Sequence, residues 1–263
     1  MLHSRWINGA LAYWETHQSR IVDAIGAGVV KYINHFTDLP LDNATWYPND
    51  WMTLGTNAGA DIFSLPASMT GGILQVGTGA AAGDNDEAYM QLGGAACATN
   101  APFVIAGALG VANNYPLYFG ARVKALEHAD EAYFVGLAEE GSAVTGFIAA
   151  DATAMVNKDF IGFNTLSGTP TVWNITWKAL GAVVNTTAVA VNASDWHIFE
   201  FWYDGQTTVS FWIDGVQSST TATTTASTFP SAEEMAPIIA VKTGQGTLKR
   251  LHVDWLRVIQ FFT

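Results

Sequence analysis

Apolar and polar residues alternate along most of the chain from about residue 37 onward. In residues 119–125 every second position is apolar, from Phe119 to Ala125, and Trp173, Ile175 and Trp177 repeat the pattern further on. A period of two residues is typical of a strand with one buried face. Residues 133–138 are instead apolar on both sides, which predicts a strand that is covered on both faces.

The strongest local pattern is a hairpin over residues 196–215. Two alternating apolar runs are separated by Asp204-Gly205, and Asp214-Gly215 follows the second run. Glycine accepts the positive φ of a tight hairpin turn, so both dipeptides predict turns. Trp202 and Trp212 fall on the face opposite the apolar one. The residues that alternation places inward here and in the other clear strands are Phe119, Val123, Phe199, Phe201, Val209, Phe211, Ile213, Val253 and Trp255.

Residues 1–36 have a different pattern. Ile21, Ile25, Val29 and Ile33 are spaced near a helical period, and glycines interrupt them, so we expect a broken short helix around residues 17–34. The preceding residues 5–14 are aromatic and extended in character. This N-terminal arm is too short to form its own core, and it must pack on its own domain or on a partner. We therefore divide the chain into an arm, 1–36, and a β-sandwich, 37–263.

Many strands, few helices and regular turns indicate an all-β fold, a β-sandwich of two antiparallel sheets. The 263 residues carry a net charge of −12, which disfavours nucleic acid as a partner. No apolar run approaches the roughly 18 residues of a membrane span, so no membrane partner is expected. Only 13% of residues are charged, against about 25% in typical domains, which suggests that much of the surface faces other protein.

One loop has the composition of a cation site. Asp84, Asp86 and Glu87 lie within four residues, and calcium takes oxygen ligands from such loops. The spacing lacks the rest of an EF-hand, and acidic residues also cap turns, so we expect no metal and no cofactor. No segment has the pattern of a nucleophilic serine or of a phosphate-binding loop, and we assign no catalytic residue.

Residues 195–205, 209–216 and 251–258 resemble the hairpin and last strand of concanavalin-A-like (laminin-G-like) jelly rolls. The hydrolases of that fold carry their acids as Glu-x-Asp-x-Glu or Glu-x-Asp-x-x-Glu on one strand. Here Glu200 is followed by Asp204, and no segment supplies the three acids. Because retaining glycosidases need two carboxyl groups across the scissile bond, we expect the chain not to be an enzyme.

A narrower resemblance rests on residues 5–10, 84–89, 116–124 and 134–138, whose order is similar to that in tailed-phage capsid decoration (cement) proteins. It implies a non-enzymatic virion structural protein, a homotrimer bound to the major capsid protein on the outer capsid surface. The arm is then expected at an assembly interface, through Arg5, Trp6, Ile7, Leu11, Tyr13 and Trp14.

The alternative is a lectin-like glycan-binding module of a virion, with a fibre or adhesion role. It depends on the fold and on Trp202 and Trp212, because two outward tryptophans on paired strands form a platform on which a sugar can stack. The same two residues could also form a subunit interface, or a surface that a neighbour of the second sheet covers, and the sequence does not choose among these roles.

Overall fold

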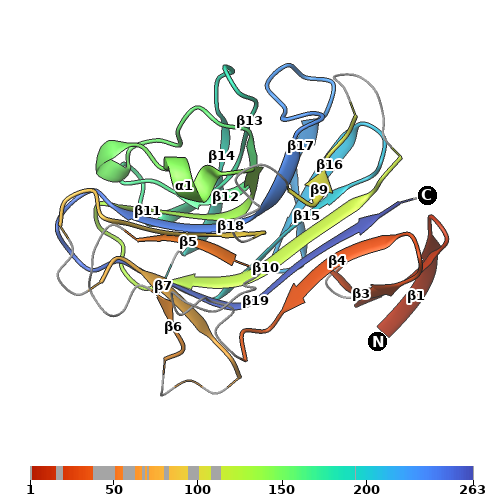
Figure 1. The fold of residues 1–263 in the computed structure, drawn as a ribbon, viewed down its shortest axis with the longest axis horizontal. Helices are drawn as coiled ribbons and strands as arrows, with labels where there is room; N and C mark the ends of the chain where they lie inside the picture. Colours follow the sequence, from red (N-terminus) through yellow and green to blue (C-terminus); the bar gives the residue numbers. More distant parts are fainter. Residues whose placement is uncertain are drawn as a thin grey trace.

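The computed structural model describes residues 2–15, 20–37, 51–55, 63–66, 69, 71–79, 83–93, 101–107, 114–192 and 194–262. Two 8-stranded antiparallel sheets pack face to face, and a 3-stranded sheet from the N-terminus lies at one end, close to the C-terminus (Figure 1). This architecture confirms the predicted all-β jelly roll. Among the described residues, no helix has the length and apolar character needed to cross a membrane.

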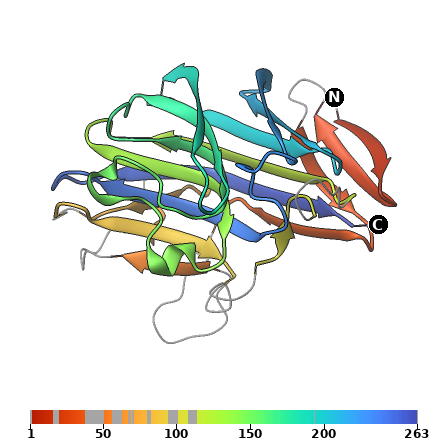
Figure 2. The ribbon, with the colours of Figure 1, turned by 90° about the horizontal axis from the view of Figure 1, so that it is seen from above.

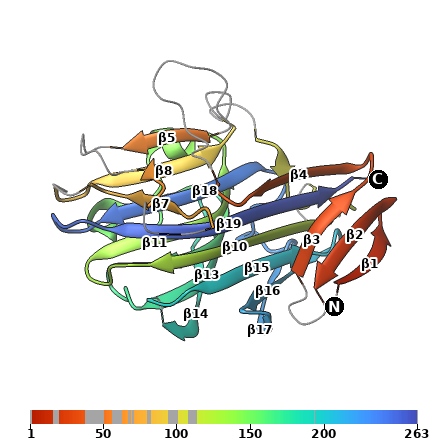
Figure 3. The same ribbon diagram turned by 90° about the horizontal axis from the view of Figure 1, so that it is seen from below.

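The first large sheet, called sheet 1 below, is built from strands that are far apart in the sequence: β4 (Val29–Asn34), β6 (Phe63–Ser64), β7 (Leu74–Gly77), β10 (Leu117–Ala125), β15 (His197–Tyr203), β16 (Thr208–Ile213), β17 (Val216–Thr223) and β19 (Arg250–Phe261). Its order is β17-β16-β15-β10-β19-β7-β6, and β4 also pairs with β19. Figure 3 shows β10 and β19 side by side near its middle, with β16 and β17 toward one edge.

The second large sheet, sheet 2, is made in the same way from β5 (Trp51–Gly55), β8 (Glu87–Leu92), β9 (Phe103–Val104), β11 (Glu131–Glu139), β12 (Phe160–Thr165), β13 (Val172–Lys178), β14 (Asn185–Asn192) and β18 (Glu234–Thr243). Its order is β14-β13-β12-β11-β18-β8-β5, and β9 pairs with β18. A short helix α1 (Ser142–Thr145) and a 3₁₀ turn η2 (Ala150–Ala152) connect β11 to β12. Seen from above, the strands of the two sheets run across the picture, and one sheet lies over the other (Figure 2).

The N-terminal residues form strands where we expected a helix. The N-terminal sheet consists of β1 (Leu2–Ile7), β2 (Ala10–Glu15) and β3 (Arg20–Ile25), and the chain then enters β4 of sheet 1. The predicted short helix around 17–34 is therefore wrong in its described part. Ile21 and Ile25 pair with β2, whereas Val29 and Ile33 pair with β19, so their regular spacing does not reflect one apolar face.

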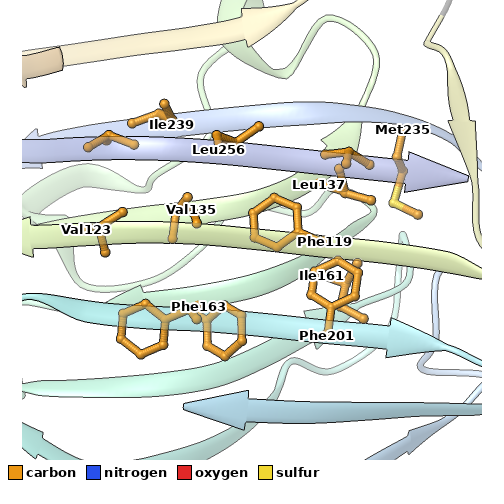
Figure 4. Packing of buried hydrophobic residues seen from close by; sticks show 14 of the residues in the cluster. Phe119, Val123, Val135, Leu137, Ile161, Phe163, Phe201, Met235, Ile239 and Leu256 are labelled. Atoms are coloured by element: carbon orange, nitrogen blue, oxygen red, sulfur yellow. The ribbon is translucent and has the colours of Figure 1, made fainter. Parts of the chain in front are cut away.

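The main core fills the space between the two large sheets. Alternate side chains of β10 and β15 meet those of β11 and β12, and they are fully buried (Figure 4). Phe163 of sheet 2 stacks on Phe199 of sheet 1 with ring centroids 4.7 Å apart, and Trp173 lies 4.8 Å from the same ring. The far face of β11 packs Phe134 in a second cluster, so this strand is covered on both faces as predicted.

The hairpin over 196–215 also forms as predicted. β15 pairs with β16, and Phe201 stands opposite Phe211. Asp214 and Gly215 both have positive φ in the two-residue turn that leads to β17, as a tight hairpin requires. Asp214 accepts hydrogen bonds from the backbone N–H of Ile198 and contacts Nδ1 of His197 at 2.7 Å, which holds the turn against the neighbouring strand.

Of the residues expected inward, Trp255 is the exception. Seven of the nine are buried in the main core, and Ile213 packs against it. Trp255 differs because the pairing of β10 with β19 shifts its register between Arg122 and Val123. This irregularity places the extra residue Asp254 in β19. A single inserted residue exchanges the two faces of a strand. Trp255 therefore lies on the outer face, where its ring covers the Cα of Gly120.

One buried carboxyl group makes the stability of the domain depend on pH. Glu131 is fully buried at the start of β11, and the ammonium group of Lys249 lies 3.7 Å from its Oε2. Burial raises the pKa of Glu131 to about 7, although Lys249 opposes the shift. Because the folded state holds this proton more tightly than the unfolded state, the contribution of Glu131 to stability falls as pH rises from about 4.5 to about 7.

We therefore expect the melting temperature of the wild type to fall relative to that of Glu131→Gln as pH rises through this range. Scanning calorimetry between about pH 4 and pH 8 measures the melting temperatures of both proteins. Their difference at each pH isolates the effect of Glu131, because the other titrating groups are common to both proteins. Parallel curves for the two proteins would show that Glu131 keeps its ordinary pKa.

Candidate functional site

The outer face of sheet 1 carries a group of aromatic side chains. Trp202 of β15 stands opposite Tyr118 of β10, and Trp212 of β16 stands opposite Glu200. Alternation along the strands forces this arrangement, because Phe201 and Phe211 point into the core. The structure thus confirms that Trp202 and Trp212 share the face opposite the apolar one.

The N-terminal sheet covers one part of this face. Ala10, Ala12, Ile21 and Ala24 are buried against Tyr118, Ile259 and Phe261 in a separate apolar cluster. The small alanine side chains allow the two sheets to approach closely. Hydrogen bonds also hold the N-terminal sheet against sheet 1. Asn8 Nδ2 donates to the carbonyl of Asn114 at 2.7 Å, and the N–H of Phe262 donates to the carbonyl of Gly28.

A cavity of about 300 Å³ remains between the N-terminal sheet and sheet 1. Its floor is formed by Tyr118, Trp202 and Trp212, and its roof by the N-terminal residues Arg5, Trp14, Glu15 and Ile21. The floor and the roof come from opposite ends of the sequence. We call this space the roofed cleft.

The polar groups of the roofed cleft are few and fixed. Tyr118 donates its hydroxyl hydrogen to Oε1 of Glu200 at 2.6 Å, and Glu200 is only 1% exposed beneath the floor. The guanidinium of Arg5 lies 3.8 Å from the centre of the Trp14 ring, a cation–π contact that orients both side chains. Partial burial lowers the pKa of Arg5, which stays a cation. Glu15 adds a carboxyl group.

The same face continues away from the cleft along β10 and β19. Arg122 forms an ion pair with Asp254, and its guanidinium lies over the Trp196 ring at 4.6 Å. Arg257 lies over Trp255 at the same distance. Stacked pairs of arginine and tryptophan therefore extend the aromatic surface beyond the roof.

His252 lies at the far end of this face, where Gln75 Oε1 is 3.0 Å from its Nε2. Burial lowers the pKa of His252 to about 4, and Arg250 and Lys124 add to the shift. The imidazole is therefore neutral at physiological pH. It serves as a fixed hydrogen-bonding group there and does not add a positive charge to the face.

The structure separates the arm residues that we expected at an assembly interface. Arg5 and Trp14 line the roofed cleft, and Ile7 packs in the apolar cluster beneath the N-terminal sheet. Trp6, Leu11 and Tyr13 lie on the other face of that sheet, where Trp6 is 71% exposed. The arm thus packs on its own domain, and its role in a trimer stays a prediction of the resemblance.

Sequence reasoning missed Glu15, Ile21 and Tyr118 as lining residues. Tyr118 could have been found, because it precedes the inward Phe119 and so falls on the same face as Trp202 once β10 and β15 are paired. Glu15 and Ile21 could not have been found, because the sequence does not show where the N-terminal sheet docks.

The acidic loop at residues 83–87 uses its carboxylates in contacts within the protein. Asp86 accepts a hydrogen bond from the N–H of Gly83, and Glu87 pairs with Lys242 at 3.0 Å and accepts a hydrogen bond from Tyr89. Asp84 lies in the turn before them. Within the part of the chain that the structure describes, no three His, Cys, Asp or Glu side chains are grouped so that they could hold a metal ion.

Comparison with known proteins identifies the fold. No family model and no curated protein matches the sequence. Among solved structures, an endo-β-1,3-glucanase from Pyrococcus furiosus has a TM-score of 0.58 at 12% identity over 99% of this chain and 98% of its own. The laminarinase catalytic domain from Thermotoga petrophila gives 0.56 at 14% over 88% and 96%, and the β-glucanase of Bacillus licheniformis gives 0.52 at 11% over 87% and 97%.

These similarities correct the function that we inferred from the sequence. Glucanases are carbohydrate-active enzymes, and no solved structure among these neighbours is described as a capsid protein. The interpretation as a non-enzymatic capsid decoration protein is therefore wrong. It relied on four short motifs. The identities, below 15%, show the fold alone: the chain is a concanavalin-A-like jelly roll.

Proposed function

We propose that the protein binds a β-glucan or a closely related neutral glycan in the roofed cleft. The observation that carries this proposal is the aromatic lining: Trp202 and Trp212 on the floor face Trp14 on the roof across a cavity of about 300 Å³. Glucans enter the proposal because the solved structures of similar fold include several glucanases.

Stacking explains why tryptophans suit this ligand. The hydroxyl groups of a β-glucopyranose lie at the rim of the ring, so its faces present C–H groups, which pack on an aromatic face in the same way as other apolar groups. Because the rings of Trp202 and Trp212 are only partly covered, they remain accessible to a ligand. Binding would bury the apolar area that they expose, which is favourable by about 25 cal/mol per Å².

The polar residues of the cleft supply the complementary contacts. Sugar hydroxyls both donate and accept, so they can pair with the guanidinium of Arg5 and with the carboxylate of Glu15. A small number of fixed polar groups among apolar walls is the usual composition of a small-molecule site. Arg5 is held by Trp14 before the ligand arrives, which reduces the entropy lost on binding.

Hydrolysis of the bound glycan is the second candidate function. Two carboxyl groups favour it: Glu15 lines the cleft, and Glu200 lies under the floor in contact with Tyr118. Glycosidases use a pair of carboxyl groups on either side of the scissile bond. Our sequence analysis searched for acids along one strand, whereas here the two come from β2 and β15.

The test measures binding and turnover on the same samples. Isothermal titration with soluble mixed-linkage β-glucan and with laminarin reports binding, and release of reducing ends reports hydrolysis. We expect measurable binding to at least one of these glucans. If turnover occurs, it should be lost in Glu15→Gln and in Glu200→Gln, whereas Glu140→Gln, away from the cleft, serves as the control.

Absence of binding to both polymers and to a broader glycan array would contradict the proposed function. Turnover that persists in Glu15→Gln and in Glu200→Gln would place the reaction elsewhere on the molecule.

A further inference from the structure

The roofed cleft is closed on one side. The apolar cluster that joins the N-terminal sheet to sheet 1 contains Tyr118, Ile259 and Phe261, which belong to β10 and β19. All three are 2% exposed or less, and Val29 and Ile33 of β4 extend the cluster further in the same direction. A ligand that entered between the sheets would therefore meet packed side chains on the side of β19.

The floor itself is also bounded within the sheet. The rings of Tyr118 and Trp255 together fill the space above Gly120, and Trp255 is only 6% exposed. Trp202 contacts Phe261 in an edge-to-face arrangement with centroids 6.0 Å apart, so one edge of its ring abuts the closed side. The accessible part of the floor thus narrows from Trp212 toward Tyr118.

The opposite side, toward β16 and β17, is open. Among the described residues, the cluster beneath the N-terminal sheet contains no side chain of either strand. Trp212 is half-buried at the rim, and most residues of the edge strand β17 are exposed. Across the strands, the cleft is therefore closed toward β19 and open toward the edge of sheet 1 at β17.

A glucan chain that stacks on Trp212, Trp202 and Tyr118 in turn runs across the strands and meets the closed side. The interior of a polymer therefore does not fit along this row of rings, because it would need an exit toward β19. The volume of about 300 Å³ lies at the small end of the range for small-molecule sites, on the order of 300–1,000 Å³. Such a space holds a terminal sugar residue and at most part of the next one. The rest of a longer chain would leave across Trp212 toward β17.

We propose that the site binds the end of a β-glucan chain and that the N-terminal sheet creates this selectivity by closing the side of β19. The inference rests on the proposed function and specifies its ligand. Each lining residue then has its own part of the ligand. Trp202 stacks on the terminal sugar beneath the roof, and Arg5 and Glu15 pair with the hydroxyl groups of that sugar. Trp212 stacks on the next part of the chain where it leaves the cleft.

A comparison of linear and cyclic ligands tests the inference. A linear β-gluco-oligosaccharide and a cyclic β-glucan present the same sugar, but the cyclic molecule has no end. We expect the linear ligand to bind at least tenfold more tightly by isothermal titration. For linear glucans of increasing length, the dissociation constant per mole of chain should stay constant.

The roof is tested with a matched pair of variants. Trp14→Ala should weaken binding of the linear oligosaccharide at least fivefold, whereas Trp6→Ala removes a tryptophan from the outer face of the same sheet and should leave binding unchanged. Melting temperatures of both variants establish that the fold is intact.

Each outcome decides a different point. Preference for the linear ligand, together with loss in Trp14→Ala, supports the inference. Equal binding of the cyclic glucan, or affinity per chain that rises with chain length, overturns chain-end recognition but leaves glycan binding in place. No binding of either ligand overturns the proposed function and the inference with it.

Discussion

Trp212→Ala is expected to weaken β-glucan binding about 30-fold, a loss of about 2 kcal/mol, which is typical when a central aromatic contact is removed from a binding site. Trp212 is suitable because it lines the cleft from β16 and is not part of the main core. Trp202→Ala should have an effect of similar size, but Trp202 also packs on Phe261 and its loss will cost some stability.

The double variant shows whether the two rings act on one ligand. Trp202 and Trp212 are diagonal neighbours on paired strands, so the effects of the two substitutions are not expected to add independently. Trp212→Phe keeps an aromatic face and should recover part of the affinity. Trp6→Ala is the control for loss of an exposed tryptophan. Unchanged affinity in Trp212→Ala, with the fold intact, would remove the floor of the cleft from glycan binding.

Phe199→Ala is expected to destabilise the domain by about 3–5 kcal/mol, because a fully buried phenylalanine leaves a cavity when it is truncated. Its ring contacts both Phe163 and Trp173 of sheet 2, so the substitution weakens the packing of the two sheets on each other. The loss is a large share of the roughly 5–15 kcal/mol that stabilise a typical domain. Roughly 10 °C in melting temperature should be lost.

Two variants calibrate this measurement. Phe199→Leu keeps most of the apolar volume and should cost much less. Val216→Ala removes an apolar side chain from β17 that is 72% exposed, and its melting temperature should match the wild type. A melting temperature of Phe199→Ala within about 2 °C of the wild type would show that this position does not lie in the packed core.

Local patterns were sufficient for the elements whose partners are close in the sequence. The β15–β16 hairpin was predictable because alternation fixes the faces of its strands and Asp204-Gly205 marks the connection between them, although that connection is a longer loop than the tight turn expected. The outward direction of Trp202 and Trp212 followed from the same alternation. For β11, apolar residues at every position correctly indicated burial on both faces.

The sequence failed where distant partners decide the structure. The spacing of Ile21, Ile25, Val29 and Ile33 fits a helix, but hydrogen bonds to β2 and to β19, more than 200 residues away from β4, stabilise strands instead. Trp255 turned outward because of a register shift against β10 that no local pattern indicates.

The sequence by itself determined the β-sandwich class, the hairpin and the aromatic side chains on its outer face, because these depend on a repeat of two residues and on turns between neighbouring strands. Only the tertiary structure determined the cleft. Its floor and roof are separated by most of the chain, and Arg5, Trp14 and Glu15 meet Tyr118, Trp202 and Trp212 only because alanines on the N-terminal sheet allow it to pack closely on β10 and β19. That docking depends on the complementary shapes of two surfaces, which the order of residues along each strand does not reveal.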